Sequence, residues 1–141
     1  MTAGGLDRFV DAQRSTYDRA LAELHAGAKQ SHWMWFVFPQ IAGLGLSSTA
    51  RFYAIADAVE AVAYLSHPIL GTRLRECTDA MLGWAGRKTA EAILGPVDAM
   101  KFVSSMTLFD AVAQDDNRFA RALAAFNHGE RDPLTLELTL G

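Results

Sequence analysis

Apolar residues recur every three or four positions through most of the chain, which is the spacing of helices that bury one face. In the first such stretch the shared face carries Leu6, Phe9, Val10, Gln13, Tyr17, Leu21 and Leu24. Gly27 follows at the point where a left-handed C-terminal cap is expected. The pattern therefore predicts one long amphipathic helix that ends at Gly27.

The segment from Ser31 to Pro39 is rich in apolar side chains on every side, so its periodicity fits a buried strand and a buried helix equally well. Val37 is its only β-branched residue, Ser31 can cap the start of a helix, and Pro39 can end one. We therefore predict a short helix here, followed by a loop over residues 43–48, whose serines can cap the next helix.

Helical spacing continues downstream, with a different pattern only at the end of the chain. The expected helices carry Phe52, Ile55, Val59 and Val62 (continuous or broken near Asp57); Leu70, Leu74, Cys77 and Met81 after His67-Pro68; Thr89 to Leu94; Phe102, Met106, Phe109 and Ala113 after Pro96; and Phe119, Leu123 and Phe126 before Gly129. Residues 132–141 instead alternate leucines with other residues, which predicts a lone extended segment.

One strand without a partner forms no sheet, and no hairpin signal occurs elsewhere. We therefore predict an all-α fold, an irregular bundle of about six or seven packed helices with no sheet. No linker or repeat divides the sequence, so residues 1–141 are expected to form a single compact helical domain.

Composition excludes several classes of protein. The 141 residues are 50% hydrophobic and 21% charged, which rules out a disordered chain. Thirteen basic and sixteen acidic residues give a net charge of −3, so no basic field attracts nucleic acid. Residues 30–50 are uncharged but interrupted by Pro39 and glycines, whereas a membrane span needs about 20 apolar residues. With charges where a secretory signal needs an apolar core, we expect a cytoplasmic protein without nucleic-acid or membrane partners.

Cysteine and histidine usage argues against metal chemistry. Cys77 is the only cysteine, so no internal disulfide can form, and its place in an apolar stripe predicts a core residue. The four histidines lie far apart and show no metal-ligand spacing: His25, His32, His67 and His128. We therefore predict no metal site and no cofactor.

The aromatic segment is the first candidate for function. Trp33 and Trp35 bring two indoles together beside His32, with Gln40 just beyond. One interpretation is that these rings form the centre of the core. The other is that a short helix cannot bury every face, so some of these side chains line a cavity suited to a flat ring. The neighbouring loop 43–45 lacks the signature of a phosphate-binding loop.

A second candidate lies in the helix after Pro96. Asp98, Lys101 and Ser105 follow at i, i+3 and i+7 and share one face, with Ser104 beside them. A solvated polar edge explains the pattern, but hydroxyl residues are mediocre helix formers. The same groups could grip an anionic ligand, or the lysine could activate a serine. The order differs from the Ser-x-x-Lys signature, which argues against nucleophilic catalysis.

Two further polar residues have ordinary structural interpretations. His67 precedes Pro68 at a helix start, where it is expected to cap the helix or form a surface hydrogen bond. Glu60 lies in an apolar stretch and is interpreted as a helix-surface carboxylate, with a buried general acid or base as the alternative.

Three sequence words identify a resemblance that covers about residues 9–135. They are Lys29-Gln30-Ser31-His32-Trp33-Met34-Trp35-Phe36-Val37-Phe38-Pro39-Gln40 with Gly43-Leu44-Gly45-x-Ser47, His67-Pro68-x-Leu70-Gly71-x-Arg73-Leu74, and Asp98-x-x-Lys101-x-x-Ser104-Ser105-Met106-Thr107-Leu108-Phe109. The chain resembles the bacterial family catalogued as domain of unknown function 1810. The resemblance implies an all-helical single domain and leaves the activity open. Members are often labelled calpastatin, but that inhibitor is a disordered polar chain, which this composition excludes.

The aromatic segment, residues 31–39, also looks like one short helix of small N-glycosidases that act on riboflavin-pathway intermediates and ADP-ribose derivatives, but it lacks their acidic residue after Ser31.

Three functions therefore stay open. The first is a pocket for an anionic or nucleotide-like small molecule, lined by His32, Trp33, Trp35, Gln40, Arg73, Lys101, Ser104 and Ser105. The second is an N-glycosidase or hydrolase that uses His32 or Glu60 for proton transfer. The third is a protein-interaction module with an exposed aromatic patch. The first two require the two candidate segments to face each other across a cavity.

Overall fold

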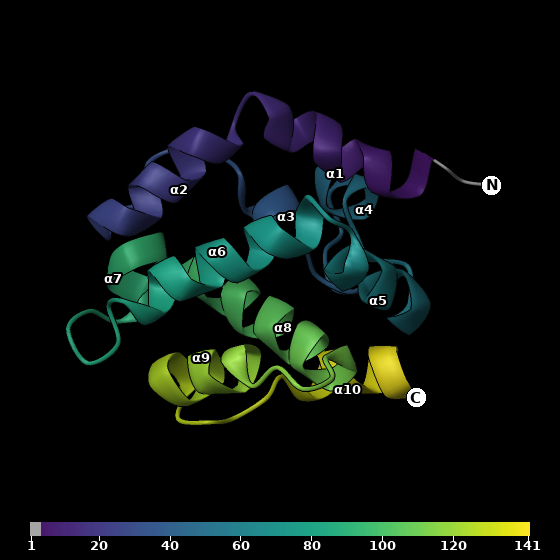
Figure 1. Ribbon diagram of the computed structural model, residues 1–141. Coiled ribbons are helices and arrows are strands. Elements are labelled where there is room, and N and C mark those ends of the chain that lie inside the picture. Colours follow the sequence, from purple (N-terminus) through teal and green to yellow (C-terminus); the bar gives the residue numbers. More distant parts are fainter. Residues whose placement is uncertain (1–3) are drawn as a thin grey trace.

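The computed structural model describes residues 4–141 and shows an array of helices (Figure 1). The helices in this part of the chain are α1 (Gly4–Arg14), α2 (Tyr17–Ala26), α3 (Met34–Val37), α4 (Ser48–Phe52), α5 (Ala58–Ser66), α6 (Leu70–Leu82), α7 (Ala90–Leu94), α8 (Pro96–Val112), α9 (Arg118–Asn127) and α10 (Pro133–Leu140). The only strand-like pairing among residues 4–141 is an isolated bridge between Ile41 and Ile55. The predicted all-α fold is confirmed, with ten helices rather than six or seven.

The expected N-terminal helix is two helices. The chain bends between α1 and α2, where the Thr16 hydroxyl donates to the Ala12 carbonyl (2.7 Å). The bend lets Phe9 of α1 and Leu24 of α2 both reach the interior, and both are fully buried. Gly27 ends α2 in the left-handed conformation (φ 69°), as its position in the sequence predicts.

The aromatic segment forms the one-turn helix α3, which packs against α1 and α6. Trp33 precedes α3 and is buried with Met34, Phe36 and Phe38. The predicted short helix is therefore present, but Ser31 does not cap it. Its N-cap residue is Trp33, and the Ser31 hydroxyl donates to Glu23 of α2 instead.

Helix α8 lies at the centre of the array and packs against α5, α7, α9 and α10 (Figure 1). Two of its rings form aromatic pairs with other elements. Phe102 meets Phe38 at 5.0 Å between ring centroids, and Phe109 meets Tyr64 of α5 at 5.4 Å. Since α8 contributes to one continuous core with the aromatic segment, the two candidate segments of the sequence are packed against each other.

The expected helix over residues 52–65 is interrupted, and part of its predicted face is wrong. Ile55 is buried beside Ile41, but Phe52, Val59 and Val62 are exposed. Helix α5 turns a different face to the core, with Ala61, Tyr64 and Leu65 buried. The spacing of Val59 and Val62 therefore predicts the wrong buried face of α5, because two of the buried positions hold an alanine and a tyrosine.

The C-terminal tail is helical, which corrects the predicted extended segment. Asp132 is the N-cap residue of α10, where its carboxylate accepts a hydrogen bond from the Thr135 amide (3.1 Å), and Pro133 occupies the first turn. This start signal outweighs the alternation of leucines. In the helix the leucines point to different sides, and Leu134, Leu138 and Leu140 are exposed.

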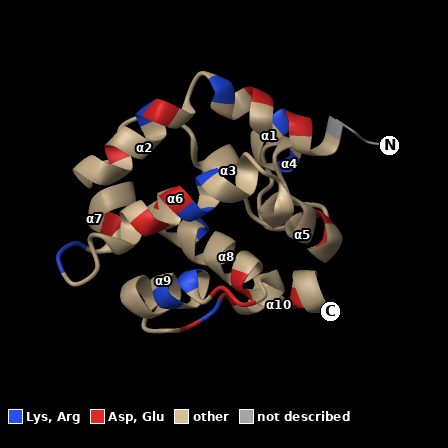
Figure 2. Cartoon of the chain, in the orientation of Figure 1, with Lys and Arg blue, Asp and Glu red and all other residues tan. Residues whose placement is uncertain are grey.

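Charged residues of both signs are interspersed over the helices in the view of Figure 2. This agrees with the small net charge of −3. Within residues 4–141, every helix falls short of the length and apolarity that crossing a bilayer requires.

Gly71, in the first turn of α6, permits the close packing of α6 on the end of α5. A Cβ atom at residue 71 would collide with the Leu65 carbonyl and would lie 2.9 Å from Nη1 of Arg75. Alanine usually stabilises a helix by about 1 kcal/mol relative to glycine. Here we expect Gly71→Ala to destabilise the fold by about 1–3 kcal/mol in urea unfolding, because backbone cannot move aside easily.

Gly83→Ala is the matched control, since Gly83 has helical φ and ψ (−60°, −20°) and a Cβ there would approach nothing closer than 3.3 Å. Its free energy of unfolding should change by less than about 0.5 kcal/mol. Equal effects of the two substitutions would contradict the proposed role of the Leu65 carbonyl.

Candidate functional site

The aromatic segment and α8 face each other, but side chains fill the space between them. Lys29 Nζ lies 2.9 Å from Asp98 Oδ2, and Lys101 Nζ lies 5.2 Å from the ring centroid of Trp35. The cavity beside Trp35 and Gln40 lies toward residues 41–54 rather than α8, and it measures only about 10 Å³. Such a volume admits about one water molecule, so this cavity is too small for a ligand.

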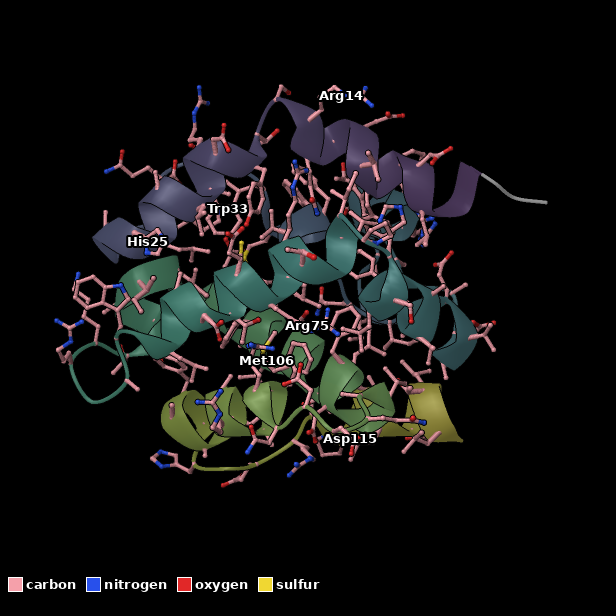
Figure 3. All side chains as sticks on the ribbon, viewed as in Figure 1. Arg14, His25, Trp33, Arg75, Met106 and Asp115 are labelled. Atoms are coloured by element: carbon pink, nitrogen blue, oxygen red, sulfur yellow. The ribbon has the colours of Figure 1, made fainter. Side chains whose placement is uncertain are left out.

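Trp33 belongs to the core and is fully buried (Figure 3). Its indole N–H donates to Glu23 Oε1 of α2 (2.9 Å). The same carboxylate accepts hydrogen bonds from the Gln30 amide (2.8 Å), the Ser31 amide (3.0 Å) and the Ser31 hydroxyl. Partial burial opposes ionisation of Glu23, but these hydrogen bonds outweigh it and lower the pKa to about 2, from an ordinary value of 4.5. Glu23 therefore anchors the aromatic segment to α2 as a charged group.

Lys29 provides the second anchor. Its side chain is only 9% exposed, and its ammonium pairs with Asp98 and donates to the Ser31 carbonyl (2.6 Å). The same nitrogen lies 5.0 Å from the ring centroid of Trp33, a cation–π distance. The sequence-based site did not include Lys29 or Glu23. Lys29 begins the first family word quoted above, whereas no sequence signal connects Glu23 with Trp33.

Three of the predicted residues meet at the molecular surface. Trp35 and Gln40 are half-buried and line the same small crevice, and Lys101 extends over Trp35 with its side chain 27% exposed. Among residues 4–141 the indole N–H of Trp35 and the side-chain amide of Gln40 have no hydrogen-bond partner, and neither is a fully buried group. We refer to Trp35, Gln40 and Lys101 as the Trp35 surface.

The remaining predicted residues lie apart from the Trp35 surface. His32 is exposed, and Ser104 is buried with its hydroxyl 3.5 Å from an oxygen of Asp132. Ser105 is fully buried, and its hydroxyl lacks a partner in the described part of the chain. Arg73 lies with α1 and α2, where its guanidinium is 4.5 Å from the ring centroid of Tyr17.

The structural interpretations of His67 and Cys77 are confirmed, whereas Glu60 is a half-buried carboxylate with 20% of its side chain exposed. Nδ1 of His67 accepts hydrogen bonds from the amides of residues 69 (3.1 Å) and 70 (3.2 Å) at the start of α6. Glu60 pairs with Arg8 of α1 (3.1 Å). Cys77 is fully buried, and burial raises the pKa of its thiol to about 12, so it is uncharged at neutral pH. No group of three or more metal-ligating side chains occurs among residues 4–141.

The hydrogen bonds to Glu23 make a pH-dependent contribution to stability. The pKa of Glu23 is lower in the folded chain than in the unfolded chain, so its stabilisation is complete above about pH 4.5 and is lost as the pH falls toward 2. Between pH 5 and about 2.5, the wild type should lose roughly 1–2 kcal/mol of its free energy of unfolding through Glu23, allowing for solvent screening, and Glu23→Gln should not show this loss. Urea unfolding at several pH values in this range measures the difference.

The control is Glu130→Gln, because Glu130 is exposed and its side chain makes no hydrogen bond or ion pair to residues 4–141. This variant should follow the wild-type pH dependence. If both glutamines change it equally, the effect comes from net charge and not from the hydrogen bonds to Glu23.

Comparisons with known proteins agree with the resemblance stated from the sequence. A search of curated proteins gives no match. The solved structure described as "conserved hypothetical protein Rv1873" from Mycobacterium tuberculosis is similar, with a TM-score of 0.93 and 44% sequence identity over 96% of each chain. The sequence pattern of the family described as "Protein of unknown function (DUF1810)" matches residues 3–139. With this match over nearly the whole chain, the protein belongs to the DUF1810 family.

Proposed function

We propose that the protein binds a small anionic, nucleotide-like molecule at the Trp35 surface. One observation carries the proposal: the Lys101 ammonium lies over Trp35, Gln40 lines a crevice with Trp35, and the ammonium, the indole N–H and the side-chain amide have no hydrogen-bond partner among residues 4–141. All three groups can donate to the oxygens of an anion. The half-buried indole adds apolar area for a flat ring.

Local charge supports an anionic ligand. Asp98 lies between two lysines, but its carboxylate is 2.9 Å from Lys29 and 3.9 Å from Lys101. The carboxylate therefore pairs mainly with Lys29. The two ammonium groups and the one carboxylate together carry a net charge of +1. Lys101 is the more exposed of the two lysines, with 27% of its side chain exposed against 9%. The excess charge is therefore available at the surface.

The size of the crevice limits how the ligand binds. About 10 Å³ is too small for any metabolite, so the ligand would lie on the Trp35 surface with most of its area in contact with solvent. Such a site gives modest affinity, which suits a metabolite present at high concentration.

The alternatives have less support. Proton transfer at this surface would need an acid or base there, but Glu60 pairs with Arg8 of α1 and His32 makes no hydrogen bond to the described residues. The exposed apolar residues come from several elements: Leu46, Phe52, Val59, Val62, Ile69, Val97, Met100, Leu134, Leu138 and Leu140. Scattered apolar side chains are normal on protein surfaces, so a protein-interaction module lacks a specific supporting observation.

Thermal-shift titrations with AMP, ADP and ADP-ribose test the proposal. A ligand at about 100 times its Kd adds about 2.7 kcal/mol of stability and should raise the Tm by several degrees. We expect Lys101→Met to weaken binding about tenfold or more, because the methionine keeps the contact with Trp35 but lacks the charge. Trp35→Ala should weaken binding as well.

Lys88→Met is the matched control. Lys88 also lies over an indole, with its Nζ 5.3 Å from the ring centroid of Trp84. This variant should retain the wild-type shift. A shift that survives Lys101→Met, or no shift with any of the three probes, would exclude the Trp35 surface as a nucleotide site.

A further inference from the structure

A separate cavity of about 270 Å³ lies between α5, α6 and the chain after α8. Its apolar wall consists of Val62, Leu65, Val112 and Ala113, and its polar wall includes Arg75 and Gln114. Figure 3 shows Arg75 on α6, pointing toward the α8 side of the molecule. The cavity shares no lining residue with the Trp35 surface. We refer to it as the Arg75 cavity.

The guanidinium of Arg75 is held in place on two sides. Its Nε–H donates to Asp116 Oδ2 (3.2 Å), and its Nη1 donates to the Leu65 carbonyl (3.2 Å). The absence of a side chain at Gly71 leaves room for both the carbonyl and Nη1. Two bonds to different elements fix the plane of the guanidinium before any ligand arrives, which reduces the entropy lost on binding.

Asp116 is shared by Arg75 and Arg118, and Arg118 also pairs with Asp79 (2.6 Å), so two arginines and two carboxylates balance in this cluster. The Arg118 backbone amide donates to Asp116 Oδ1 (3.0 Å), and its Nη1 donates to Oδ2 (2.9 Å). Partial burial opposes ionisation of Asp116, but these bonds and the two arginines outweigh it and lower its pKa. The carboxylate thus stays ionised, with both oxygens already occupied by protein donors.

One nitrogen of the Arg75 guanidinium remains free. Its Nη2 makes no hydrogen bond to residues 4–141, whereas Nε and Nη1 each have a partner. A charged N–H donor of this kind forms a strong, charge-assisted hydrogen bond with a carboxylate oxygen. The side chains of Ser66 and Gln114 line the same cavity and offer further donors.

We propose that the Arg75 cavity binds a small monocarboxylate with an apolar body. The carboxylate accepts a hydrogen bond from Nη2 of Arg75, and the body packs against Val62, Leu65 and Val112. The volume of about 270 Å³ lies just below the usual range of ligand pockets, which begins at about 300 Å³. The ligand therefore has the size of benzoate or hexanoate rather than of a nucleotide. This site is independent of the Trp35 surface and of the function proposed there.

NMR titrations of the ¹⁵N-labelled protein with benzoate and hexanoate test the proposal, with benzyl alcohol and hexanol as neutral analogues. We expect saturable shifts of the amides around the Arg75 cavity with a Kd of about 1 mM or below. The neutral analogues should bind about tenfold more weakly or worse, because they lack the charge-assisted bonds.

Three variants locate the binding. Arg75→Lys keeps the charge but loses the fixed Nη2 donor, and it should weaken carboxylate binding about tenfold. Ala113→Leu fills the cavity and leaves every hydrogen bond of Arg75 intact, so it should abolish binding in a protein that still folds. Lys101→Met should bind benzoate as the wild type does.

The remaining outcomes overturn the proposal. Equal binding of neutral and charged probes would remove the carboxylate assignment. Loss of binding in Lys101→Met with retention in Ala113→Leu would assign the probes to the Trp35 surface. Absence of saturable shifts near the Arg75 cavity for both carboxylates would exclude the site.

Discussion

The buried ammonium of Lys29 is the constraint on which the arrangement of the aromatic segment depends. An unpaired charge in this position would cost several kcal/mol, so its partners must be present in the folded state. Those partners come from two elements, Asp98 of α8 and the Ser31 carbonyl before α3. The ion pair therefore ties the aromatic segment to the central helix, while Glu23 ties the same segment to α2.

This arrangement gives two nearby tryptophans different roles. Trp33 is the N-cap residue with non-helical backbone, whereas Trp35 lies within α3, so the two side chains need not share a side. Trp33 is buried beneath Lys29 and Glu23, whereas Trp35 lies half-buried beneath Lys101.

The Trp35 surface and the Arg75 cavity differ in chemistry. A lysine ammonium is a point charge at an open surface, whereas the Arg75 guanidinium is a fixed planar fork in a cavity.

Much of the fold is predictable from the sequence because many helix boundaries depend on local interactions. Gly27 ends α2 as predicted, and α7 occupies residues 90–94 of the short helix predicted from Thr89 to Leu94. Cys77 is buried as its apolar spacing indicates. The tail is the instructive exception. Asp132 and Pro133 start a helix there, although the alternating leucines suggest an extended chain, because a capped first turn satisfies backbone groups that a lone strand leaves unpaired.

The candidate site is predictable only in part. The sequence by itself determined that the chain is helical, which stretches before residue 132 are helical, and that the aromatic segment and α8 carry the unusual side chains. Only the tertiary structure decided that Trp35, Gln40 and Lys101 meet while Arg73 lies with Tyr17, and that a cavity forms beside Arg75. Helix signals act within a turn or two of the chain. Contacts between residues dozens of positions apart depend on how all the helices fill space together, which no local pattern encodes.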